Sequence, residues 1–243
     1  MKKLLILLAL PVLLFSCEKN DVPAGTLDGQ SAKIEKGTGK SWIKLDVNGA
    51  PQQLGLTIDD AALNSLPTMG HETMYIVPLN AAAQSVTPFS HLQVDWNPHG
   101  HEPIYGKPHF DFHFYMVPEA EVAAATDTAK MEAVPPADYL PSTYIGGPYI
   151  AKMGKHFIES TSPELNGGAF TETFVYGSYD RKVTFYEPMI TLAFLQSTTL
   201  FERPIPQPAK FLKAGKYPTK MYVSKHDGVI DIVLDGFMQR QAS

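Results

Sequence analysis

The sequence predicts a mainly β protein of the α+β class, folded as a β-barrel or β-sandwich with two or three short helices. Twenty prolines in 243 residues divide the chain into short segments, and proline is disfavoured inside helices and central strands. Several segments alternate apolar and polar residues with the period of two that marks a strand. Segments with the 3.6-residue period of a helix are few. No internal repeat is visible.

Residues 1–16 are predicted to be a signal peptide outside the fold. The segment MKKLLILLALPVLLFS has two lysines followed by an apolar run from Leu4 to Phe15. This run of about twelve residues has the length of a secretory h-region. It is shorter than the roughly twenty residues that a membrane-spanning helix needs.

The chain's single cysteine, Cys17, follows this apolar run. The sequence LFSC resembles the lipobox of bacterial lipoproteins, in which the cysteine is lipid-modified and becomes the mature N-terminus. The alternative is a free or buried thiol that merely lies near the signal. No second cysteine is present, which excludes a disulfide or a thiolate metal site in the chain. We expect a lipid-anchored protein of the cell envelope, on the periplasmic or the surface face of the outer membrane.

The charge of the mature chain indicates which partners to exclude. Loss of Lys2 and Lys3 with the signal leaves 18 basic and 25 acidic residues, a formal charge of −7. Nucleic acid and anionic lipid surfaces both require a basic protein surface. We therefore expect no nucleic-acid partner, and membrane lipid is expected to be held through acylated Cys17 alone.

Residues 17–40 are predicted to be the lipidated cysteine and a flexible tether. The segment EKNDVPAGTLDGQSAKIEKGTGK has no apolar period and is rich in glycine and charged residues. A single mainly β domain is expected over residues 41–243, although the mature chain is long enough for two small domains.

The domain is expected to begin with a strand at SWIKLDVNG, residues 41–49, which alternates and ends in the turn dipeptide Asn48-Gly49. Residues 56–67, LTIDDAALNSLP, then predict one short helix. Asp59 or Asp60 is a suitable N-cap for this helix, and Pro67 follows its end.

Three further strands and the best helix are expected next. The strands are MYIVPL at 74–79, HLQVDW at 91–96 and HFDFHFYMV at 109–117. The segment PEAEVAAATDTAKMEA, residues 118–133, is rich in alanine and glutamate and has Pro118 at a first helical position, which favours a helix. Residues 135–157 are expected to form a long, proline-rich surface connection, a kind of loop that is often functional.

The second half of the chain predicts two hairpins. Residues 169–195 contain two apolar alternating runs, with Gly177 to Asp180 as the expected turn. Residues 220–238, KMYVSKHDGVIDIVLDGFM, predict a second hairpin that turns at Asp227-Gly228.

The candidate functional residues gather in GHEPIYGKPHFDFHFY, residues 100–115. Alternate side chains of a strand share one face. One face therefore carries His109, Asp111, His113 and Tyr115. The opposite face carries Phe110, Phe112, Phe114 and Met116, which we expect to point into the core. Histidine and aspartate are competent metal ligands and proton carriers, so the polar face is expected to line a cavity or to meet water.

Residues two apart on a strand are roughly 6.6 Å apart, so one strand supplies at most a neighbouring pair of ligands without a bulge. His99, His101 and Glu102 lie in the preceding loop, where Gly100 allows a sharp turn back over the strand. His156 and the inward-facing Glu187 of VTFYEPM are further candidates. The remaining histidines, His71, His91 and His226, are expected at the surface.

We predict a mononuclear metal site in an environment of nitrogen and oxygen ligands. Its candidate ligands are His101, His109, Asp111, His113, His156 and Glu187. Such a set suits a divalent ion, with zinc expected and iron or manganese as alternatives. The competing interpretation is that these residues are hydrogen-bonded interior groups and solvent-facing histidines. No spacing here is as diagnostic as a paired CxxC or HExxH.

Several segments together resemble a family of bacterial secreted proteins and lipoproteins that carries a domain-of-unknown-function label and has a Thermus structural representative. They are WNPHGHEP, YGKPHFDFHFYMV, MGKHF with SPEL, and FVYGSYDRKVTFYEPMIT. The resemblance extends from about Ser41 to Met238. It implies a mainly β fold and possible assembly into a homo-oligomer, and it supplies no established activity.

Three functions fit these observations. The first is a membrane-anchored lipoprotein with a metal-binding β domain of unassigned activity. The second is a metal-dependent enzyme, a hydrolase or a cupin-like oxygenase or isomerase, with Glu102, Asp111 or Glu187 as general base. The third is a metal-free structural or interaction protein that forms a homo-oligomer. The sequence specifies neither a reaction nor a small-molecule ligand.

Overall fold

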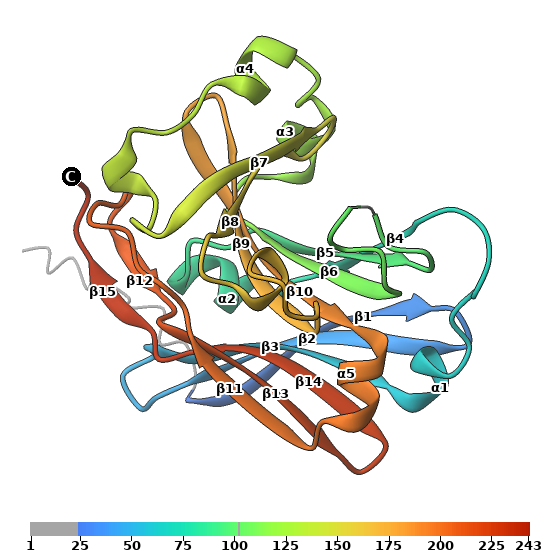
Figure 1. The fold of residues 1–243 in the computed structure, drawn as a ribbon. Coiled ribbons are helices and arrows are strands. Elements are labelled where there is room, and N and C mark those ends of the chain that lie inside the picture. The colour runs from blue at the N-terminus through green and yellow to red at the C-terminus, as the bar shows by residue number, and fades with distance from the viewer. Residues whose placement is uncertain (1–23, 102) are drawn as a thin grey trace, which may run out of the picture.

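The computed structural model describes residues 24–101 and 103–243, and it confirms the mainly β prediction (Figure 1). The strands are β1 Gly25–Ile34, β2 Gly37–Leu45, β3 Pro51–Asp59, β4 Thr73–Pro78, β5 His91–Asn97, β6 His109–Tyr115, β7 Tyr144–Ile150, β8 Gly154–Glu159, β9 Glu172–Tyr179, β10 Lys182–Thr191, β11 Leu200–Pro204, β12 Gly215–Tyr217, β13 Lys220–His226, β14 Val229–Asp235 and β15 Met238–Arg240. The α-helices are α1 Asp60–Leu63, α2 Ala81–Val86, α3 Glu119–Ala123, α4 Thr128–Glu132 and α5 Leu192–Ser197. Two 3₁₀ turns cover Ala137–Tyr139 and Pro163–Leu165.

The strands form two large antiparallel sheets and one small one. The six-stranded sheet has the order β1-β2-β3-β14-β13-β11, the seven-stranded sheet has the order β4-β5-β6-β10-β9-β8-β7, and β12 pairs with β15. The two large sheets lie over one another, and α3 and α4 lie on the far side of the seven-stranded sheet, near its edge strand β7 (Figure 1). Neither large sheet closes on itself within the described residues. The sandwich alternative is therefore confirmed and the barrel alternative is wrong.

The main core lies between the two large sheets. β6 contributes Phe110, Phe112 and Phe114 to it, all fully buried. These are the side chains that the alternation of residues 109–115 predicts to point inward. β6 lies between β5 and β10. Because neighbouring strands and apolar packing hold it on several sides, the polar residues on its other face have fixed positions.

The predicted tether is wrong over residues 25–40, where the structure has β1 and the first four residues of β2. The glycines explain why these strands are not apparent from the sequence. Gly37 and Gly39 occupy buried positions of β2, and a Cβ at Gly37 would lie 1.9 Å from Asp59 Oδ1. Because glycine replaces apolar residues at these positions, the strand period does not appear in the sequence. The predicted signal peptide, residues 1–16, and Cys17 lie outside the described residues.

The predicted helix over residues 118–133 is wrong in its continuity. It consists of α3 and α4, separated by residues that include Asp127. The Asp127 carboxylate accepts hydrogen bonds from the backbone N–H groups of Ala129 and Lys130 and so begins a new helix. Pro118 is the N-cap residue of α3 and not its first helical residue. Together with α2 and α5, this division gives five α-helices in the described chain where two or three were expected.

Two connections also differ from expectation. The predicted surface connection over residues 135–157 contains β7 and most of β8. The hairpin of β9 and β10 turns at Asp180 and Arg181, both with positive φ, and not at Gly177, which stays within β9. The turn at Asp227-Gly228 and the Asp59 cap of α1 are confirmed.

In the part of the chain that the structure describes, no helix has the length and apolar character needed to cross a membrane.

The corrected start of the domain gives a first prediction. A chain beginning at residue 24 should unfold cooperatively. A chain beginning at residue 41 should lose on the order of 3 kcal/mol of unfolding free energy or fail to fold, because it lacks β1 and the fully buried Ile34. Urea denaturation followed by circular dichroism measures the difference. Equal denaturation midpoints for the two chains would support the original prediction that residues 24–40 are a flexible tether.

Candidate metal centre

The face of the seven-stranded sheet that points away from the main core is polar and yet buried. Every residue of β5 and β6 is buried. The register places Asn97 opposite His109 and Asp95 opposite Asp111, and it places Gln93 opposite His113. The strand alternation predicted for residues 109–115 is thus confirmed, and β5 adds a second row of polar side chains beside it.

Three buried side chains from three strands form what we call the inner cluster: His113 on β6, His156 on β8 and Glu187 on β10. Glu187 Oε1 lies 3.6 Å from His113 Nε2, and Glu187 Oε2 lies 3.5 Å from His156 Nε2. β9 carries Gly177 opposite both His156 and Phe185. The Phe185 ring lies over this glycine and contacts both histidine rings, with centroid distances of 5.0 and 5.2 Å.

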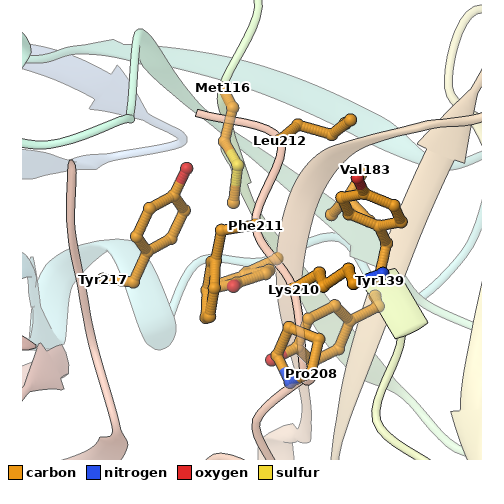
Figure 2. A pocket seen from close by; sticks show the side chains of 10 residues that line it. Met116, Tyr139, Val183, Pro208, Lys210, Phe211, Leu212 and Tyr217 are labelled. Atoms are coloured by element: carbon orange, nitrogen blue, oxygen red, sulfur yellow. The ribbon is translucent and has the colours of Figure 1, made fainter. Parts of the chain in front are cut away.

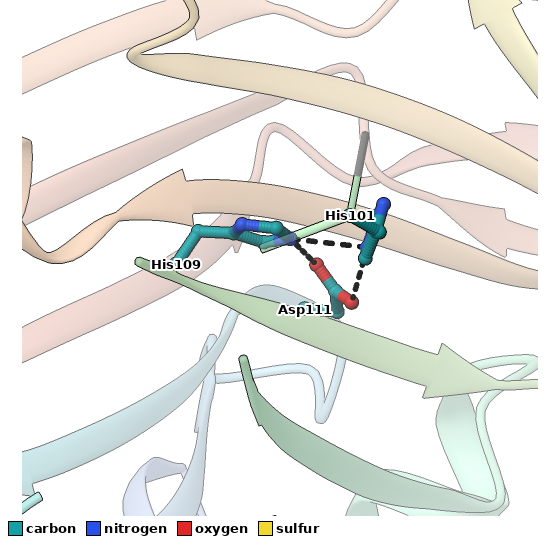
Figure 3. Close-up of side chains that lie close together, drawn as sticks. All are labelled: His101, His109 and Asp111. Carbon is teal, nitrogen blue, oxygen red and sulfur yellow. Dashed lines mark hydrogen bonds and ion pairs between the residues drawn. The ribbon is translucent and has the colours of Figure 1, made fainter. Parts of the chain in front are cut away.

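The outer cluster consists of His101, His109 and Asp111 (Figure 3). His109 Nε2 lies 3.1 Å from Asp111 Oδ1 and 3.2 Å from His101 Nε2, and His101 Nε2 lies 3.7 Å from Asp111 Oδ2. Gly100 brings His101 over the strand. Its φ is +62°, and a Cβ there would lie 2.0 Å from the carbonyl oxygen of Tyr105. The loop therefore folds back over β6, as the sequence predicts.

Groups behind the ligand atoms orient them. His109 Nδ1 lies 2.6 Å from the carbonyl oxygen of Lys107. Asn97 Nδ2 donates a 2.8 Å hydrogen bond to Asp111 Oδ2. His113 Nδ1 lies 3.0 Å from Asp95 Oδ2, close enough for ion pairing although the ring N–H is not aligned for a hydrogen bond. Histidines that bind metals usually have their other ring nitrogen held in this way by a carbonyl or carboxylate.

Burial sets the electrostatics of the inner cluster. It lowers the pKa of His156 to about 3, so this imidazole is neutral with a free lone pair. It also raises the pKa of Glu187 well above its ordinary value. Burial opposes the charged form of His113 too, but the carboxylates of Glu187 and Asp95 outweigh it and raise the pKa of His113 to about 9. His113 and Glu187 thus compete for a proton in a site with little solvent.

The outer cluster is more exposed to solvent than the inner cluster. Burial alone would raise the pKa of Asp111, but contacts with His101 and His109 lower it below its ordinary value. The pKa of His109 is raised, because the contact with Asp111 outweighs the burial of the ring. His101 has a half-exposed side chain. Asp111 therefore stays ionised in this cluster, and solvent reaches the cluster at His101.

Several buried polar atoms of the two clusters have no hydrogen-bond partner among the described residues. They are Asp95 Oδ1, Asp111 Oδ1, His113 Nδ1 and Nε2, His156 Nδ1 and Glu187 Oε2. Nearly all buried polar groups in native proteins are hydrogen-bonded, and each exception needs an explanation. Their concentration on one face of one sheet indicates that something else binds there.

One cavity of about 90 Å³ joins the clusters. Asp111 and His101 of the outer cluster line it together with all three residues of the inner cluster. Glu72, just before β4, lies at its mouth, and burial together with the negative charges of Asp95 and Asp111 raises the pKa of this carboxyl. Glu72, Asp95 and Asn97 are not among the residues predicted from the sequence. The alternation of polar His91, Gln93, Asp95 and Asn97 with apolar residues in β5 is a signal that could have found the last two.

The remaining candidates lie outside the clusters. Glu102 is outside the described residues, and His99, His71 and His226 are exposed. The expected surface position of His91 is wrong. This ring is buried and stacks on Tyr115, with centroids 4.9 Å apart, because it lies on the same covered face of the sheet.

A separate pocket lies on the opposite face of the seven-stranded sheet, beside the main core (Figure 2). Its lining is mainly apolar and aromatic, with Met116, Phe211 and Tyr217 among the side chains drawn. Its volume is about 30 Å³, about that of a single water molecule. This gap belongs to the packing of the core, and the polar cavity is the better candidate for function.

Comparison with known proteins gives one match. A family model described as TTHB210-like, hypothetical protein TTHB210, matches residues 46–96. No curated protein and no solved structure matches the chain. The match supports the expectation of an uncharacterised family with a Thermus representative. It covers β3 to most of β5 and ends before the loop and strand that carry the outer cluster.

The contact between Gly177 and Phe185 gives a second prediction. Gly177→Ala should cost about 1–3 kcal/mol of unfolding free energy, because its Cβ would lie 1.9 Å from the buried Phe185 ring. Gly146→Ala is the matched control, since its nearest neighbour is the flexible Lys155 side chain at 3.3 Å, and it should change the free energy by less than about 0.5 kcal/mol. Urea titrations measure both. Equal effects would show that the ring does not lie over Gly177.

Proposed function

We propose that this protein binds a divalent metal ion, zinc before iron or manganese, through His113, His156 and Glu187. The observation that carries the proposal is the position of the Glu187 carboxylate between two histidine Nε2 atoms at 3.6 and 3.5 Å. These distances are too long for hydrogen bonds. Bonds of about 2.1 Å to a tetrahedral ion place neighbouring ligand atoms about 3.4 Å apart.

The chemistry of the three side chains supports the same conclusion. An ion would give Glu187 Oε2 and His113 Nε2 the partner that the described residues do not provide. A buried carboxylate without a partner is costly, and a cation offsets that cost. His156 is neutral and ready to donate its lone pair, while Asp95 behind His113 would orient that ring. Nitrogen and oxygen ligands without thiolate suit zinc, iron or manganese.

A second candidate function, a metal-dependent enzyme, is favoured by the number of ligands and by the cavity beside them. Two histidines and one glutamate are a ligand set of catalytic zinc, which keeps a fourth position for water or substrate. The 90 Å³ cavity provides that space. In this case Asp111 or Glu72, both lining the cavity, would accept a proton from the metal-bound water, while Glu187 would serve as a ligand.

Metal analysis tests the proposal. The full chain, purified in detergent without a histidine tag and supplied with Zn²⁺, Fe²⁺ or Mn²⁺, should bind at least one ion. His156→Ala and Glu187→Gln should each weaken zinc binding more than roughly 100-fold, because even changes to groups behind the ligands cost 10–100-fold. Mass spectrometry of the metal content and competition with a chelator provide the measurements.

The control is His226→Ala, which removes an exposed histidine that pairs with Asp231 far from the cavity lining. It should bind zinc like the natural chain. Circular dichroism must show that each variant is folded. Failure of the natural chain to bind any of the three ions, or equal binding by His156→Ala and His226→Ala, would refute the proposal.

We also propose that acylated Cys17 anchors this domain to the cell envelope. The lone cysteine at the end of the apolar segment supports this. In a bacterial host, the natural chain should incorporate a palmitate analogue and partition into the detergent phase, whereas Cys17→Ser should incorporate none, because the acylated thioether cannot form. An unlabelled natural chain would contradict the anchor.

A further inference from the structure

We infer that the outer cluster of His101, His109 and Asp111 binds a second divalent ion, so that the cavity holds a two-metal centre. This inference rests on the proposed function of the inner cluster and extends it. The three distances between ligand atoms of the outer cluster are 3.1, 3.2 and 3.7 Å. They bracket the separation of about 3.4 Å expected around a tetrahedral ion with 2.1 Å bonds.

The orientation of His109 supports a metal ligand. Its Nδ1 lies 2.6 Å from the Lys107 carbonyl oxygen, which can only accept a hydrogen bond, so Nδ1 carries a proton. In the neutral ring, Nε2 then has a free lone pair directed at His101 and Asp111. Without an ion, a proton must lie between these groups. An ion would replace that proton and contact all three residues.

The Asp111 carboxylate is placed for the same role. Its Oδ2 accepts a hydrogen bond from Asn97, and its Oδ1 has no hydrogen-bond partner among the described residues. The side chain is 9% exposed. One oxygen is thus held from behind while the other remains available, an arrangement common for carboxylates that bind metals.

The two clusters share one space. Asp111 and His113 are successive residues on one face of β6, roughly 6.6 Å apart along the strand, and both line the 90 Å³ cavity. Ions bound to them would therefore face the same cavity. Pairs of ions in one site orient a substrate and stabilise its oxygen atoms when a bond is hydrolysed.

The charge of the cavity also favours divalent cations. Asp111 and Glu187 are buried in its lining, Asp95 is buried behind His113, and Glu72 lies at its mouth. No lysine or arginine is among the described residues that line it. Divalent cations would offset the negative charge that these carboxylates carry when ionised. Uncompensated charge at buried positions is costly.

Zinc stoichiometry tests the inference, with His101→Ala as the main variant because His101 is half exposed and its loss should spare the fold. His99→Ala, an exposed histidine two residues away in the same loop, is the matched control. Each full chain is stripped with a chelator, titrated with ZnCl₂ by calorimetry and analysed for bound metal. The natural chain and His99→Ala should bind two ions, and His101→Ala should bind one.

A second variant and a second ion keep the outcomes distinct. Asp111→Asn should also bind one ion, and in the natural chain two Mn²⁺ ions should give the spin-coupled spectrum of neighbouring metals in electron paramagnetic resonance. One ion in the natural chain, lost in His156→Ala but kept in His101→Ala, would overturn the two-metal centre and leave the proposed function intact. Two ions in His101→Ala, or two uncoupled Mn²⁺ ions, would also overturn it. No bound ion at all would refute the proposed function itself.

Discussion

The constraint on which this structure depends is the burial of a polar sheet face. Carboxylates and imidazoles are normally solvated, and removing them from water costs several kcal/mol per charge unless partners replace the solvent. β5 and β6 nevertheless place two rows of such groups within a seven-stranded sheet, on the face nearer to α3 and α4 (Figure 1). The fold must supply partners to these groups, and it does so only in part.

Apolar packing on the opposite face of the same strands offsets the cost of burying these polar groups. Phe110, Phe112 and Phe114 alternate with the polar residues of β6 and are completely buried against the other large sheet. Fully burying such a side chain contributes about 1.5–3 kcal/mol. Each polar residue on β6 is thus flanked in sequence by residues that fix the backbone. A sheet held in this way is a rigid base for ligands, and rigidity is what a metal or catalytic site requires.

The sequence predicts the parts of the site that depend on a single strand or loop. The period of two assigns the two faces of β6, and Gly100 predicts the return of the loop that carries His101. The division of the six candidates into two clusters does not follow from the sequence, because it depends on strand order. Only the placement of β8 two strands from β10 brings His156 to Glu187. The same limit explains β1 and β2, where buried glycines replace the apolar residues that would mark strands.

The division into two clusters also changes the role that can be assigned to the histidines. A mononuclear site explains three of the six candidate ligands. It leaves His101, His109 and Asp111 as a group of interacting polar side chains beside the cavity. In that case the His109 ring would need a proton on each nitrogen, because Nδ1 faces the Lys107 carbonyl oxygen and Nε2 faces the Asp111 carboxylate. Metal binding requires deprotonated ligands and stabilises the folded chain in proportion to the occupancy of the site, by about 2.7 kcal/mol when the free ion is at 100 times its dissociation constant. A cluster whose polar atoms lack partners is therefore least stable in the metal-free chain, and the same atoms that weaken that chain would give an ion its affinity.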